Sequence, residues 1–188
     1  MPQATESLIG KVAQALSRAP AHSQQGIKES ILVAAATSYG AKSPDDLTQP
    51  TGFDPEAARL FEAILESAYL VANADGTFDE TEREAFEHVV VAACDGKVGE
   101  VQISALLADL AEQLGEDGAE KRVQMVTKGI TRSEHAREVV RVAALIAHVS
   151  GGVSPAERAV VEKLARSLGL DTGATDAALA DVRTALSQ

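Results

Sequence analysis

The sequence predicts an all-α fold, a compact helical domain of about seven to nine helices built around a duplicated helix–loop–helix. Aromatic residues make up only 3% of the chain and Trp is absent, while Ala, Val and Leu dominate the apolar content. This composition suits closely packed helices better than a β-sandwich. Apolar residues recur with helical spacing, and no segment alternates polar and apolar residues as a half-buried strand does.

Two helices are predicted in the first part of the chain, each from one apolar stripe. The stripes consist of Leu8, Ile9, Val12 and Leu16 and of Ile27, Ile31, Leu32 and Ala35. The second helix is expected to stop at Gly40, in the left-handed conformation that glycine adopts readily. The proline-rich stretch 41–55 is typical of a linker,. Residues 1–50 are therefore predicted to be an N-terminal helical segment and linker, and residues 51–188 the main helical domain.

Clear helix signals follow from residue 54 onward, where Asp54 is a predicted N-cap and Pro55 a first helical residue. Further helices are expected over about 80–94, 101–114, 118–129, 137–149, 155–168 and 174–186,. The segment 137–149 is apolar on nearly all sides, which predicts a buried central helix,. One shared core is expected to contain Leu70, Phe86, Val89, Leu145, Val161 and Leu164, and surface ion pairs are expected among Glu134, Glu138 and Arg141.

Charge and motif content exclude several function classes. The net charge of −11 disfavours nucleic acid as a partner, because phosphate binding relies on concentrated Lys and Arg,. Cations or a basic protein surface fit better. The single cysteine, Cys94, is expected to be a core or helix-end residue,. The sequence contains no phosphate-binding loop, nucleophile elbow or paired-histidine zinc motif, so no enzyme is expected. No secretory signal or spanning segment is recognised, which predicts a cytoplasmic protein without membrane insertion.

One loop motif occurs twice, 75 residues apart. The stretch "AYLVANADGTFDETER" (68–83) aligns without gaps onto "AALIAHVSGGVSPAER" (143–158). Each copy is an apolar helix, a glycine break, a hydrophobic residue, a cap and a second helix. The identical pairs are Ala68 and Ala143, Leu70 and Leu145, Ala72 and Ala147, Gly76 and Gly151, Glu82 and Glu157, and Arg83 and Arg158. This pairing predicts a duplicated unit whose copies pack against each other.

These loops admit a structural interpretation. Asp79 with Glu82, and Ser154 with Glu157, have the spacing of capping boxes. In a capping box the cap oxygen accepts a bond from the third helical N–H, and the Glu carboxylate reaches back to the cap N–H. On this interpretation both Glu residues serve chiefly to start a helix.

The first loop also admits a cation site. In the register of an EF-hand loop, Asn73, Asp75, Asp79 and Glu82 occupy ligand positions 3, 5, 9 and 12, with Gly76 at position 6,. Val71 occupies position 1 and cannot bind a metal, so an EF-hand proper is not expected. A weak oxygen-only site for Ca²⁺ or a similar divalent ion remains an alternative. The second copy has too little charge for such a site.

The stretches "ADGTFDETE" and "SGGVSPAE", each between two helices, resemble the paired motif of the tellurite-resistance TerB family. The resemblance covers about 60–170 and makes residues 51–188 a TerB-like domain. It implies an all-helical cytoplasmic protein with acidic sites for a divalent metal. Asp75, Asp79 and Glu82 match the motif, with Asn73 close by; in the second copy Ser150 replaces the Asp, so only Glu157 carries over.

The resemblance implies a non-enzymatic role in tellurite, metal or general stress response, with other proteins of a membrane-associated complex as partners. An alternative function is a metal-independent helical module that binds proteins through an acidic surface. The TerB-like fold also occurs in proteins without a tellurite role, so the fold leaves both functions open.

Overall fold

Eight α-helices and no β-strand make up the described part of the chain, residues 2–20, 26, 28–41, 53–149 and 152–187 of this computed structural model. The all-α prediction is confirmed. Arg18 and Glu29 form one isolated antiparallel bridge. The helices are α1 (Pro2–Ser17), α2 (Ile31–Gly40), α3 (Pro55–Ala72), α4 (Glu80–Ala93), α5 (Glu100–Lys128), α6 (Ser133–Ala147), α7 (Pro155–Ser167) and α8 (Ala174–Leu186). Most of the predicted linker lies outside the described residues.

The helix boundaries follow the caps read from the sequence. Asp54 accepts backbone N–H bonds at the start of α3, and Asp79 and Ser154 form capping boxes at the starts of α4 and α7. Gly118 interrupts α5 with a φ of 74°, which separates the two helical segments predicted there. Helix α2 starts later than predicted, because Ser30 caps it at Ile31; Ile27 lies outside the described residues.

Gly40 ends α2 for a different reason from the predicted one. Its φ is not positive, so the predicted left-handed C-cap is wrong. A β-carbon at this position would lie 1.6 Å from the backbone oxygen of Lys97. Glycine is therefore needed for close approach of α2 to the turn before α5. The Gln102 side chain reinforces this contact, because its Nε2 donates to the Gly40 oxygen at 3.2 Å.

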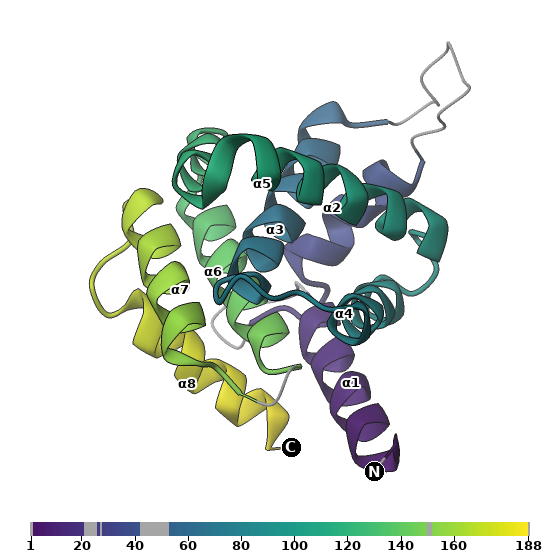
Figure 1. Cartoon of the computed structure of the whole chain (residues 1–188). Helices are drawn as coiled ribbons and strands as arrows, with labels where there is room; N and C mark the ends of the chain where they lie inside the picture. Colours follow the sequence, from purple (N-terminus) through teal and green to yellow (C-terminus); the bar gives the residue numbers. More distant parts are fainter. Residues whose placement is uncertain (1, 21–25, 27, 42–52, 150–151, 188) are drawn as a thin grey trace.

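Helices α3 and α6 form the centre of the fold (Figure 1). These are the first helices of the two repeat copies, and they pack more extensively against each other than any other pair. Helix α2 covers α3, α8 covers α6, and α1 packs against α4. The duplicated units therefore meet through their apolar helices, as predicted.

The core consists of two apolar clusters on either side of α6. Val139, Val142 and Leu145 belong to the first cluster, whereas Val140 and Ala143 belong to the second. The six residues predicted to share one core are all buried, but they divide between the clusters. The first cluster holds Phe86, Val89 and Leu145, and the second holds Leu70, Val161 and Leu164.

Helix α6 also carries a buried ion pair. The prediction of surface pairs is wrong for Glu138 and Arg141, whose exposed fractions are 1% and 8%. Arg141 Nε and Nη2 donate to the two Glu138 oxygens at 2.9 and 2.8 Å. Arg141 also donates to the backbone oxygens of Ala15 at 2.9 Å and Arg18 at 3.3 Å. A cation thus lies at the C-terminal end of α1, where the free carbonyls favour positive charge.

Candidate functional site

The loop after α3 holds Asp75 by its own backbone. Asp75 Oδ1 accepts from the Thr77 N–H at 2.9 Å and from Thr77 Oγ1 at 2.8 Å, and Gly76 adopts a φ of 82°. These bonds make an Asx-turn, in which a carboxylate substitutes for a backbone carbonyl. They also lower the pKa of Asp75, mainly through the Thr77 N–H and then through its hydroxyl. Asp75 therefore orders the turn while remaining exposed.

Asp79 and Glu82 form the predicted capping box. Asp79 Oδ1 accepts from the Glu82 N–H at 2.9 Å, and Glu82 Oε2 accepts from the Asp79 N–H at 3.1 Å. Each of these carboxylates commits one oxygen to starting α4. The structural interpretation of this pair is confirmed.

Asn73 and Phe78 attach the loop to the core. Asn73 is the C-cap of α3, and its Nδ2 donates to the Tyr69 hydroxyl at 3.3 Å. The Phe78 ring lies edge-on between two aromatic rings, with centroids 5.2 Å from Tyr69 and 6.1 Å from Phe86. The apolar position of the loop motif thus anchors the turn between α3 and α4.

The second copy keeps the cap without the acidic loop. Ser154 Oγ accepts from the Glu157 N–H at 3.2 Å, and Glu157 Oε2 accepts from the Ser154 N–H at 2.7 Å. Glu157 is 8% exposed. Ser150 and Gly151 of the motif lie outside the described residues. Glu157 therefore serves to start α7.

The predicted metal ligands do not assemble into a cluster. Asp75, Asp79 and Glu82 lie in one loop, but within the described ranges no three His, Cys, Asp or Glu side chains are close enough to hold an ion together. Binding at this loop would need its carboxylates to move. The metal site therefore stays a prediction.

Residues 61–180 match the family described as tellurite resistance protein TerB. This match covers more than half of the chain, including α4 to α7 and most of α3 and α8. The chain belongs to the TerB family. Neither the curated proteins nor the solved structures provide a match. None of the helices in the described part combines the length and apolar character needed to cross a bilayer.

The two TerB loops share one further feature. Arg83 pairs with Glu87, and Arg158 pairs with Glu162 at 3.0 Å, at equivalent repeat positions. Each arginine also donates a hydrogen bond to a side chain of another helix. Arg83 donates to Ser104 of α5 at 3.1 Å, and Arg158 donates to Asp176 of α8. The arginine that follows the capping Glu in each copy therefore connects the capped helix to a neighbouring helix.

The charge of this TerB protein is segregated along the chain. Residues 73–120 contain thirteen Asp and Glu against two Lys and Arg, a formal charge of −11 that equals the charge of the whole protein. Residues 121–188 contain ten Lys and Arg against seven Asp and Glu, a formal charge of +3. This asymmetry depends only on the positions of the charged residues, so the sequence alone contains it,.

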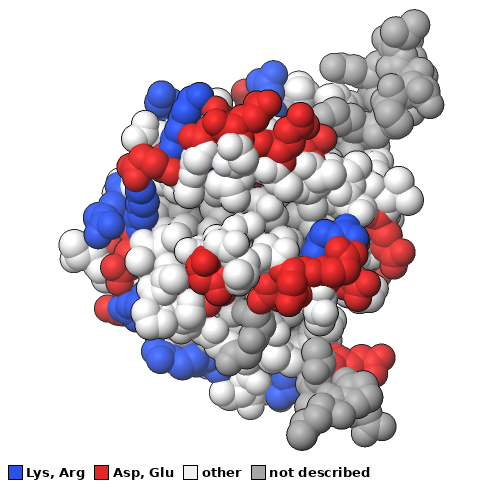
Figure 2. Space-filling view, viewed as in Figure 1, with Lys and Arg blue, Asp and Glu red and all other residues white. Residues whose placement is uncertain are grey.

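The structure places much of this negative charge on α4 and the first part of α5. In Figure 2 the carboxylates gather in two groups, one over α5 and one over α4, with uncharged atoms between them. Arg83 lies within the α4 group, where it pairs with Glu80 and Glu87. We call this surface the acidic face; its exposed residues are Glu80, Glu84, Glu100, Asp109, Glu112 and Glu116. The acidic face is thus a surface that the fold could offer to a basic partner.

Proposed function

We propose that this TerB-family protein is a non-enzymatic helical module of a tellurite or related stress system, which binds a partner protein through its acidic face. The observation that best supports this proposal is that residues 73–120 alone have a formal charge of −11, equal to that of the whole protein. Such a field steers a basic partner toward one side of the molecule and repels acidic surfaces. Nucleic acid is disfavoured as a partner for the same reason.

The acidic face also supplies an apolar contact. Val101, in the first turn of α5, is 83% exposed next to Glu100. Protein interfaces combine apolar contact near the centre with polar groups around it. Helix α5 is held in place beneath this surface, because its residues Ile103, Leu107 and Leu110 are buried in the core. A rigid, charged helical surface supports binding without any need for bound metal.

A weak divalent-cation site at the first loop is a second candidate, and it agrees with what the resemblance implied. The supporting observation is that Asp75, Asp79 and Glu82 each use one oxygen to order the loop. A carboxylate has two oxygens, so each side chain still has an oxygen to offer Ca²⁺ or a similar ion once the three carboxylates have moved closer together,. Glu157 is not included, since it is buried in the second capping box.

The main proposal is tested by neutralising the acidic face. In the organism that carries the gene, the wild type and the triple variant Asp109→Asn, Glu112→Gln, Glu116→Gln are tagged, cross-linked in the cell and compared by quantitative mass spectrometry. A control variant removes the same charge elsewhere, through Glu6→Gln, Glu56→Gln and Asp176→Asn.

At least one protein with a basic surface should cross-link to the wild type and the control but not to the acidic-face variant. The same variant should fail to restore tellurite tolerance to a deletion strain. Equal cross-linking and equal tolerance for all three proteins would overturn the proposal.

A further inference from the structure

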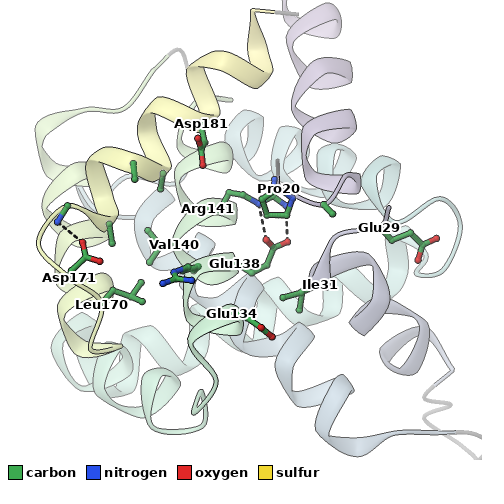
Figure 3. Close-up of a pocket in the computed structure, with 16 residues that line it drawn as sticks. Pro20, Glu29, Ile31, Glu134, Glu138, Val140, Arg141, Leu170, Asp171 and Asp181 are labelled. Atoms are coloured by element: carbon green, nitrogen blue, oxygen red, sulfur yellow. Dashed lines mark hydrogen bonds and ion pairs between the residues drawn. The ribbon is translucent and has the colours of Figure 1, made fainter. Parts of the chain in front are cut away.

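A cavity of about 460 Å³ lies away from the acidic face, between α6, α8 and the residues Ala19, Pro20 and Glu29, which follow α1 or precede α2 (Figure 3). Its walls are largely apolar. The apolar residues that line it include Ile31, Val140, Leu170, Ala174, Ala177 and Ala178. Its volume falls within the range of about 300–1,000 Å³ that is typical of small-molecule sites.

The base of the cavity is preformed by the Glu138–Arg141 ion pair. Figure 3 shows the two side chains joined between the labelled wall residues. Arg141 satisfies both Glu138 oxygens and two backbone oxygens of the α1 end, so these charges largely cancel within the protein. A ligand would meet a fixed surface and would not need to order it.

The rim of the cavity is negatively charged. The lining contains five carboxylates and two guanidinium groups, a formal charge of −3. Glu138 is matched by Arg141, and Glu29 pairs with Lys97 at 3.1 Å. The remaining charged groups of the lining are the carboxylates of Glu134, Asp171 and Asp181, which are labelled around the cavity in Figure 3, and the Arg137 guanidinium. Together they leave a formal charge of −2, and Asp171 Oδ1 also accepts from the Gly173 N–H at 3.0 Å. Apolar walls strengthen the field of such groups, because they exclude water.

From this geometry we infer that the cavity binds a small amphiphilic organic cation. Its hydrocarbon part would lie on the wall formed by Val140, Leu170 and the alanines of α8, and its ammonium or guanidinium group would point to the acidic rim. A protein partner fits less well, because a stable protein interface buries about 800 Å² on each partner, whereas this cavity has the size of a small-molecule site. The inference does not depend on the acidic face and goes beyond the proposed function.

The test uses n-octylammonium as the probe, with 1-octanol and octanoate as its neutral and anionic counterparts. Binding is followed by ¹H–¹⁵N correlation spectra of the full chain, below the concentration at which the probe forms micelles. Saturable shifts should appear in residues 134–141 and 170–181. Octanol should bind about fivefold more weakly, which corresponds to the loss of about 1 kcal/mol of charge interaction, and octanoate more weakly still.

Two substitutions on α8 separate binding in the cavity from binding elsewhere. Ala177 is exposed and lines the cavity, so Ala177→Leu should fill it and weaken binding about tenfold,. Ala180 is exposed on the same helix outside the lining, so Ala180→Leu should bind like the wild type. Glu134→Gln should weaken octylammonium about threefold and leave octanol unchanged, because only the charge is lost.

Three results would overturn the inference: no saturable shifts, shifts confined to α4 and α5, or equal affinity for octylammonium and octanol. The triple variant of the acidic face should bind octylammonium like the wild type. This measurement distinguishes failure of the cavity from failure of the proposed partner surface, because each is tested by a variant that leaves the other intact.

Discussion

Replacing Arg141 by Met should destabilise this protein strongly. The change removes the partner of Glu138, which is 1% exposed, and leaves a carboxylate without its counter-charge. It also removes the donors to the backbone oxygens of Ala15 and Arg18 at the end of α1. Breaking a buried pair by removing one member costs about 3–5 kcal/mol.

This loss is large against the total stability of a domain, about 5–15 kcal/mol. The matched control is Arg158→Met, which removes an exposed arginine from its pairs with Glu162 and Asp176. Exposed pairs contribute about 0–1 kcal/mol, so this control should remain close to the wild type. Urea unfolding followed by far-UV circular dichroism measures both variants, since the chain lacks Trp,.

The double variant Glu138→Met, Arg141→Met sharpens the test. It removes both charges together, so it should be more stable than Arg141→Met alone, although the α1 carbonyls still lose their donor. Hydrogen exchange should also accelerate in α1 of the single variant, because its C-terminal anchor is gone. Equal unfolding free energies for Arg141→Met and Arg158→Met would refute the argument that burial makes the first pair important.

Four further outcomes are expected. Leu145→Ala should lower the free energy of unfolding by about 2–5 kcal/mol, because Leu145 is buried in the first core cluster,; a loss below about half a kcal/mol by urea unfolding would contradict its central place. Asp79→Ala should cost about 1 kcal/mol as a lost cap, measured in the same way,. Calorimetric titration with millimolar Ca²⁺ should give weak saturable binding that falls in Asp75→Asn, and no heat above dilution in either protein would leave the loop a capped turn. Burial raises the pKa of Cys94 to about 12, so its thiol should react with iodoacetamide at pH 8 only in denaturant,; rapid labelling of the native protein would disprove this.

Local interactions explain why much of the fold could be predicted. The caps at Asp54, Asp79 and Ser154 bind backbone groups only two or three residues away, so a short stretch of sequence contains the whole interaction. The apolar period then identifies which face of each helix is buried. The duplication was visible for a similar reason, because each copy repeats the same local signals.

Interactions between distant residues required the tertiary structure. Arg141 binds the Ala15 carbonyl 126 residues away, so a spacing that suggested a surface pair became a buried one. Gly40 is needed because the Lys97 backbone approaches it. The same limit applies to function. The sequence alone indicated the family, the capping boxes and the net charge. The carboxylates of the first loop could be found in the same way, because they are neighbours in the sequence. Only the packing of α6 and α8 against the end of α1 formed a cavity, since its walls come from segments that no local pattern connects.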